Sequence, residues 1–316
     1  MSLRVFTDKR CLEHQVPGGF PEQPERLQRM TAGLRAAGIP LEEAGEHSHT
    51  EEAVQAVHSA DYIQRFRDAV AGGAKFLDTG DNPLSEGTWR AARAAVDVCL
   101  HTSDWVFGGP DRKGIAAVRP PGHHAEHAMA MGFCYFNNVA VAAEYLMRWR
   151  GVERLAVVDF DVHHGNGTQH LFEDRDQILY VSTHQYPFYP GTGAAQETGK
   201  DAGMGATLNI PLPAGSGDEA YEEVFCKILL PTVRQYAPQA VLISAGFDAW
   251  RADPIGGMRV SEEAFRNWGR WLGQIADDVC EGRVLVTLEG GYDLEALAAL
   301  VVAHSQGLAE AKPVGG

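Results

Sequence analysis

Three residues of metal-binding type stand at alternate positions in one short segment. Asp159, Asp161 and His163 directly follow the apolar stretch Leu155–Val158. If the predicted strand continues through them, their side chains face the same way, because strand side chains alternate between two sides. Zinc takes carboxylate and imidazole ligands, and a catalytic zinc keeps one position open. The segment predicts part of a metal site, with a hydrogen-bonded strand end as the alternative.

Asp248 offers a third ligand from a distant part of the chain. It follows the apolar stretch Ala240–Ser244 and Gly246, where a buried carboxylate is unfavourable unless it is paired or metal-bound. The alternative is a carboxylate that caps the next turn.

Two histidine pairs and one tyrosine complete the reactive set. His123 and His124 follow one predicted strand, and His163 is followed by a second histidine. Histidine is the usual general acid and base near neutral pH. Tyr292 follows two glycines, whose backbone freedom can direct a phenol into a crevice, where it would donate to a developing oxyanion. A half-buried surface tyrosine is the alternative.

The elements that must position these residues alternate along the chain. The predicted strands are Ile115–Val118, Leu155–Val158, Ile178–Ser182, Ala240–Ser244 and Val284–Leu288. The predicted helices are Pro24–Ala37, Ser85–Ser103, Asn137–Arg150, Asp218–Gln235, Ser261–Asp278 and Leu294–Gln306, with Ser85, Asp218 and Ser261 as N-caps. This order predicts a parallel sheet covered on both faces. The polar segments follow the carboxyl ends of strands, so we expect them to meet at one edge of the sheet.

Composition is that of a soluble globular protein, with 316 residues, 45% hydrophobic and 22% charged. No linker or repeat divides it, so we expect residues 1–316 to form one α/β domain. The net charge of −15 disfavours nucleic acid as a partner. We expect no membrane span, no secretory signal, a cytoplasmic location and five buried, reduced cysteines. Nothing in the sequence specifies an oligomeric state.

Several motifs together resemble the histone deacetylase family, in that family's order and from about residue 6 to residue 307. They are Pro21-Glu-Gln-Pro-Glu-Arg26, Arg119-Pro-Pro-Gly-His-His-Ala-Glu, Gly132-Phe-Cys-Tyr-Phe-Asn-Asn, Asp159-Phe-Asp-Val-His-His-Gly-Asn-Gly-Thr, Tyr189-Pro-Gly-Thr-Gly, Ser244-Ala-Gly-Phe-Asp248 and Glu289-Gly-Gly-Tyr292. The residues of these motifs are most similar to those of the class II branch and its bacterial relatives. The resemblance implies the three-layer arginase/deacetylase fold, with a mostly parallel central sheet flanked by helices.

The resemblance also implies a role for each matching residue. Zinc would be held by Asp161, His163 and Asp248, and a structural potassium by Asp159, Asp161, His163, Ser182 and Thr183. The catalytic set would be His123, His124, Tyr292, Asp159 and Asn166, with Asp159 orienting His123. Substrate would meet a tunnel lined by Gly132, Phe133 and Tyr189, with Asp81 and Ile255 at its rim.

Two positions depart from common family patterns. Asn166 stands where class I members have an aspartate, and a neutral amide favours the imidazolium of His124 less than a carboxylate would. Phe20 stands where many relatives have a histidine, so we expect the rim of the tunnel to differ.

The implied activity is zinc-dependent hydrolysis of acetyl-lysine in a protein or peptide, or of small acetylated amines such as acetylpolyamines. Ile255 stands where one polyamine-selective branch has a glutamate, which favours acyl-lysine, whereas Asp81 suits both substrates. A two-metal ureohydrolase would need an aspartate where Gly165 stands. A non-catalytic acetyl-lysine binding protein would not need the complete reactive set.

Overall fold

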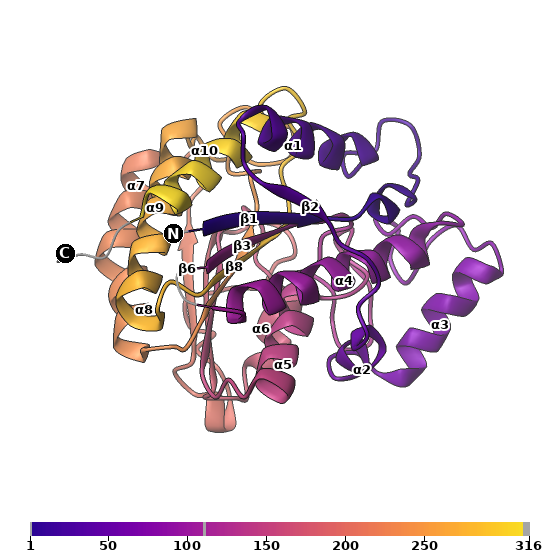
Figure 1. Ribbon diagram of the computed structural model, residues 1–316, viewed down its shortest axis with the longest axis horizontal. Coiled ribbons are helices and arrows are strands. Elements are labelled where there is room, and N and C mark those ends of the chain that lie inside the picture. Colours follow the sequence, from indigo (N-terminus) through magenta and orange to yellow (C-terminus); the bar gives the residue numbers. More distant parts are fainter. Residues whose placement is uncertain (1, 110–111, 312–316) are drawn as a thin grey trace.

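The computed structural model describes residues 2–109 and 112–311, and one eight-stranded sheet runs through its centre (Figure 1). The strands are β1 (Ser2–Thr7), β2 (Leu41–Glu43), β3 (Arg112–Ala117), β4 (Leu155–Asp159), β5 (Ile178–Gln185), β6 (Thr207–Leu212), β7 (Val241–Ala245) and β8 (Val284–Leu288). Their order is β2-β1-β3-β8-β7-β4-β5-β6, and each neighbouring pair is parallel. The carboxyl ends of all eight strands therefore lie along one edge.

The five predicted strands are confirmed as β3, β4, β5, β7 and β8. Every residue of β4, β5, β7 and β8 is buried, the pattern of parallel strands covered on both faces. The sequence did not predict the two edge strands β2 and β6. β2 has only three residues, and β6 contains Pro211, so neither carries a long β-branched signal.

Helices cover the sheet on both sides. They are α1 (Pro24–Ala36), α2 (Thr50–Gln55), α3 (Ala60–Ala71), α4 (Thr88–Phe107), α5 (Asn138–Arg150), α6 (Asn166–Phe172), α7 (Asp218–Val224), α8 (Leu230–Tyr236), α9 (Glu262–Cys280) and α10 (Leu297–Glu310). Helices α1, α9 and α10 pack on one side, and α4 and α5 pack together on the other (Figure 1). The structure thus has the three-layer arginase/deacetylase architecture, and its sheet is wholly parallel.

Two of the three predicted N-caps are wrong. Ser261 does cap α9, since its hydroxyl accepts from the backbone N–H of Ala264. Helix α4 begins three residues later than expected, after Gly87. Asp218 is the first residue of α7 rather than its cap, and its carboxylate accepts from the N–H and hydroxyl of Ser261.

The predicted helix Asp218–Gln235 is divided. A π-helical turn at Phe225–Leu229 separates α7 from α8, which has Pro231 in its first turn. Proline has no N–H and its ring clashes with the preceding turn, so a continuous α-helical hydrogen-bond pattern cannot pass through this point. Helices α2, α3 and α6 were not predicted.

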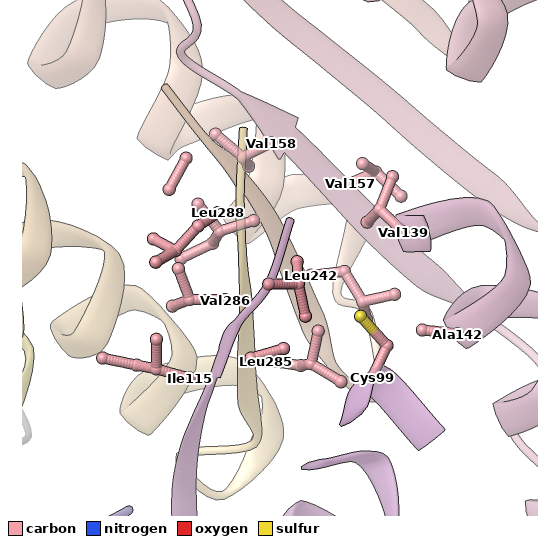
Figure 2. Close-up of a cluster of buried hydrophobic side chains, with 14 of the residues drawn as sticks. Cys99, Ile115, Val139, Ala142, Val157, Val158, Leu242, Leu285, Val286 and Leu288 are labelled. Atoms are coloured by element: carbon pink, nitrogen blue, oxygen red, sulfur yellow. The ribbon is translucent and has the colours of Figure 1, made fainter. Parts of the chain in front are cut away.

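The core forms where strand side chains of alternating direction meet the two helical layers (Figure 2). Val157 faces α5, where Val139 lies, whereas the next residue, Val158, points to the opposite side with Leu288 (Figure 2). This alternation buries apolar surface on both faces and fixes the register of the central strands. The described helices include none long and apolar enough to cross a membrane. All five cysteines are free, but Cys226 is exposed rather than buried as expected.

Candidate metal centre and active-site pocket

Asp161, His163 and Asp248 converge at the carboxyl edge of the sheet. His163 Nδ1 lies 3.0 Å from Asp161 Oδ1 and 3.2 Å from Asp248 Oδ2. Ligands of a tetrahedral zinc at ordinary bond lengths are separated by roughly 3.3 Å. All three residues are buried, and Asp248 Oδ2 makes no hydrogen bond among the described residues apart from this 3.2 Å approach of His163. A buried carboxylate oxygen in that state is unfavourable unless a cation occupies the site, so the donor set fits a divalent metal.

A turn, rather than a continued strand, brings Asp161 and His163 together. Strand β4 ends at Asp159, which corrects the expectation that all three residues share one strand face. Asp159 Oδ1 accepts from the N–H of Asp161 at 3.1 Å, and Asp161 Oδ1 accepts from the N–H of His163 at 2.9 Å. These two contacts between a carboxylate and the backbone two residues ahead hold the turn in place.

Two glycines let the backbone approach the carboxylates closely. A Cβ at Gly246 would lie 2.1 Å from Asp161 Oδ2, and one at Gly290 would lie 2.1 Å from Asp248 Oδ2. The N–H of Gly290 instead donates to Asp161 Oδ2 at 2.8 Å. Any side chain at either position would displace a proposed ligand.

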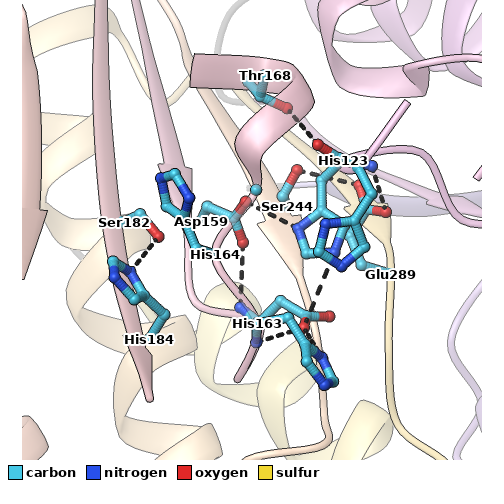
Figure 3. Close-up of polar contacts among 12 residues, drawn as sticks. His123, Asp159, His163, His164, Thr168, Ser182, His184, Ser244 and Glu289 are labelled. Carbon is cyan, nitrogen blue, oxygen red and sulfur yellow. Dashed lines mark hydrogen bonds and ion pairs between the residues drawn. The ribbon is translucent and has the colours of Figure 1, made fainter. Parts of the chain in front are cut away.

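His123 belongs to a buried charged network (Figure 3). Its Nδ1 lies 3.0 Å from Asp159 Oδ2. Burial lowers the pKa of His123, but Asp159 and Asp161 outweigh burial and raise it to about 10. Glu289 Oε2 accepts from the N–H groups of Gly122 and His123 at 2.7 and 3.1 Å. Glu289 opens the Glu-Gly-Gly-Tyr motif, but no role for it was predicted from the sequence.

His124 is held in a different electrostatic state. Its Nδ1 lies 2.7 Å from Oδ1 of Asn166, the first residue of α6. Burial, followed by the charges of His123 and His163, lowers the pKa of His124 well below its usual value. A neutral imidazole beside a charged one is a suitable arrangement for a general base.

One pocket of about 260 Å³ connects these residues to the surface. It is lined by Asp81, His124, Gly132, Phe133, His163, Phe188, Tyr189, Ile255 and Tyr292. The structure therefore brings every predicted substrate-contacting residue to one cavity. Phe188 was not predicted, although it precedes Tyr189 in the sequence. Its ring stacks on His163, with ring centroids 5.2 Å apart and an interplanar angle of 16°.

Asp81 joins two walls of the pocket. Its Oδ2 accepts from the hydroxyl of Tyr189 at 3.0 Å and from the N–H of Gly132 at 3.2 Å. A Cβ at Gly132 would lie 2.2 Å from the ring of His124, so only glycine fits beside that imidazole. The ring of Phe20 packs edge-on against the ring of Phe133, with ring centroids 5.1 Å apart, and adds a second aromatic layer to this wall of the pocket.

Tyr292 lies against a buried cluster of charges. The guanidinium of Arg26 lies 4.7 Å from the centre of its ring, and Arg26 Nε donates to the carbonyl of Gly291 at 2.7 Å. Glu22 binds both Arg26 and Arg119, at 3.0 and 2.8 Å. Burial raises the pKa of the Tyr292 phenol well above its usual value, so the group remains a hydrogen-bond donor. Glu22 and Arg26 belong to one of the sequence motifs and Arg119 opens another, but the contact between them was not predicted.

Three of the residues proposed for potassium lie on two neighbouring strands, whereas Asp161 and His163 lie in the turn after β4. Asp159 of β4 is in register with Ser182 of β5, and Thr183 follows it. Ser182 Oγ lies 2.9 Å from His184 Nδ1 (Figure 3). Potassium binding at these residues therefore stays a prediction.

Comparisons with known proteins identify the family of the chain. A profile of the Histone deacetylase domain matches residues 20–308. Histone deacetylase 15 of Arabidopsis thaliana is 40% identical over 319 residues, which cover 96% of this chain and 56% of that protein. The histone deacetylase-like amidohydrolase of Pseudomonas aeruginosa is 37% identical over 307 residues, which cover 91% of this chain and 80% of that protein. The crystal structure of an acetylpolyamine aminohydrolase from Burkholderia pseudomallei has a TM-score of 0.88 and 31% identity, covering 98% of this chain and 99% of that one. The chain belongs to the histone deacetylase family.

Proposed function

We propose that the chain is a zinc-dependent deacetylase that hydrolyses the amide of acetyl-lysine to acetate and a free amine. The observation that carries the proposal is the shared pocket. His163 of the three-residue metal group, His124 and Tyr292 all line the same cavity of about 260 Å³. A metal, a base and an oxyanion donor within one cavity are the parts that amide hydrolysis by an activated water needs.

Asp161, His163 and Asp248 would hold the zinc, which when bound would polarise the amide carbonyl and acidify a water molecule. His124, neutral in its buried site, takes the proton of the attacking water and later transfers it to the leaving amine. His123, kept protonated by Asp159, adds positive charge beside the developing oxyanion. The phenol of Tyr292 donates to that oxyanion.

The pocket's lining supports an acyl-lysine substrate. Phe133 and Tyr189 form aromatic walls suited to an extended methylene chain, and Ile255 adds an apolar rim. A second ammonium group at Ile255 would lack a partner, which disfavours polyamines there.

Acetylpolyamines are the second candidate, because Asp81 places a carboxylate in the same pocket. However, Asp81 Oδ2 already accepts from Tyr189 and Gly132. Its free acceptor capacity for an ammonium is therefore reduced.

A structural potassium would complete the proposed site. Asp159, Asp161, His163, Ser182 and Thr183 would surround it, and all are buried. A higher melting temperature in potassium than in the same concentration of sodium would support this assignment, and equal temperatures would oppose it.

The test of function combines metal analysis with turnover. Purified protein should contain close to one equivalent of zinc and release acetate from an acetyl-lysine peptide. An acetylpolyamine panel, run in parallel, separates the two substrate classes. Protein that contains zinc and binds acetyl-lysine peptide without turnover would show a binding module instead.

A further inference from the structure

Glu126 is the charged residue of the His-His-Ala-Glu motif to which the proposed mechanism gives no role. Its Oε1 lies 2.5 Å from Nδ2 of Asn166, and Oδ1 of the same amide lies 2.7 Å from His124 Nδ1. His124, Asn166 and Glu126 therefore form one continuous hydrogen-bonded chain from the pocket toward the surface. The Glu126 side chain is 18% exposed, and its outer contact is His170 Nδ1 at 2.8 Å.

We propose that Glu126 is a positioning residue that selects the amide orientation of Asn166 and, through it, the tautomer of His124. An asparagine amide fits its site almost equally well in two orientations, so its partners decide which end faces which. An ionised carboxylate can only accept hydrogen bonds. Glu126 therefore requires the NH₂ end of Asn166, which turns the carbonyl oxygen toward His124.

The amide orientation then determines where His124 carries its hydrogen. Asn166 Oδ1 can only accept, so Nδ1 of His124 must donate, and Nε2 keeps its lone pair. A general base at Nε2 needs that lone pair for the proton of the attacking water. In the reversed amide, the NH₂ group would face Nδ1, favour a hydrogen on Nε2 and block the base.

Other contacts of Asn166 are too weak to fix the same orientation. Its Nδ2 lies 3.3 Å from the sulfur of Met131 and 3.4 Å from the carbonyl oxygen of His124. A thioether is a weak acceptor, and the carbonyl contact is long. Glu126 is the strong acceptor, and it lies on the side of Asn166 away from the pocket. The aspartate that class I members carry in place of Asn166 would need no such partner, because a carboxylate accepts from Nδ1 in either orientation.

The kinetic test of this proposal depends on the proposed function, because it measures turnover. The spectroscopic test does not depend on it. Glu126→Met keeps the side chain's length and removes the acceptor, whereas Glu126→Gln keeps an acceptor oxygen. We expect kcat to fall about tenfold in Glu126→Met and less in Glu126→Gln, with KM nearly unchanged. Zinc content should stay at the wild-type level. Glu223→Gln, which removes an exposed charge on α7, is the control and should leave kcat unchanged.

The same substitution in an Asn166→Asp variant distinguishes control of the His124 tautomer from a merely structural role of Glu126. In Asn166→Asp, a carboxylate accepts from His124 Nδ1 in either orientation, and Glu126→Met also removes the repulsion between the two carboxylates, so adding Glu126→Met should not lower kcat. An equal loss of kcat in the wild-type and Asn166→Asp backgrounds would overturn the proposal.

The tautomer itself can be measured with ¹⁵N-labelled histidine, and His124→Gln identifies the signal. Wild-type protein should show His124 protonated at Nδ1, and Glu126→Met should show a mixture or the Nε2–H form. An unchanged Nδ1–H signal in folded Glu126→Met would overturn the proposal. This readout holds even if the wild type hydrolyses no acetyl-lysine peptide, an outcome that would count against the proposed function alone.

Discussion

Asp253 ties the backbone of Tyr292 to the rim of the pocket. Its Oδ2 accepts from the N–H of Tyr292 at 2.7 Å, while Oδ1 accepts from the N–H groups of Ile255 and Gly256 at 3.0 and 3.2 Å. One largely buried carboxylate therefore holds both the proposed oxyanion donor and the residue proposed to discriminate between substrates.

Asp253→Asn should lower kcat by about tenfold, because an amide cannot accept from all three N–H groups and Tyr292 loses its fixed position. Zinc content should not change. Asp218→Asn is a matched control, since Asp218 accepts from the N–H and hydroxyl of Ser261 away from the pocket. Equal kcat values for Asp253→Asn and wild type would show that Tyr292 is positioned by other contacts.

Asp248→Ala should remove both zinc and activity, because two remaining ligands bind the metal too weakly. Metal analysis and turnover of an acetyl-lysine peptide test this together. A hydroxamate should inhibit the wild type by chelating zinc at its open position. Near-stoichiometric zinc with retained turnover in Asp248→Ala would contradict the ligand assignment.

Tyr292→Phe removes one hydrogen-bond donor and leaves the ring packing on Arg26 intact. Loss of such a donor typically costs on the order of 100- to 1,000-fold in kcat. Tyr221→Phe is the control, because the Tyr221 hydroxyl is buried outside the pocket without a hydrogen-bond partner among the described residues. A rate for Tyr292→Phe within about threefold of wild type would exclude the tyrosine from the reaction.

Ile255→Glu should shift preference toward acetylspermidine, because a carboxylate at the rim can pair with the second ammonium group. The measurement is kcat/KM for an acetyl-lysine peptide and for acetylspermidine. Ile255→Gln has similar length without the charge, so it should shift preference much less. A wild type that already prefers acetylspermidine by tenfold or more would show that Ile255 does not select against polyamines.

Glu22→Gln should destabilise the fold by about 3–5 kcal/mol, because it leaves the buried guanidinium groups of Arg26 and Arg119 without their carboxylate. Burial raises the pKa of Glu22, but Arg119 and Arg26 outweigh burial, and the net pKa is lowered. A lowered folded-state pKa gives stability that is present above the unfolded value of about 4.3 and is lost as pH falls through the folded value. Denaturant unfolding at several pH values should show the difference from wild type shrinking in acid. A constant difference would contradict the ionised state of Glu22.

The sequence by itself determined the sheet's central strands and the residues at their ends. Buried parallel strands such as Val284–Leu288 are apolar on both faces, so they stand out from their surroundings without any partner being known. Because all these strands run in parallel, the residues that follow them had to meet at one edge. The metal group and the histidine pair could therefore be predicted together from positions far apart in the chain.

Only the tertiary structure decided which partner each of these side chains has. Glu126 meets Asn166, and Asp253 meets Tyr292, across 40 and 39 residues of chain. Such contacts depend on how loops pack above the sheet, and no local periodicity encodes that packing. For the same reason, the turn that brings Asp161 and His163 together was not predicted. An alternating pattern of residues in the sequence does not distinguish a strand that continues from one that ends in a turn. Burial and charged neighbours together then decide their chemistry. Burial is the main cause that lowers the pKa of His124, whereas Asp159 and Asp161 raise the pKa of His123 despite its burial.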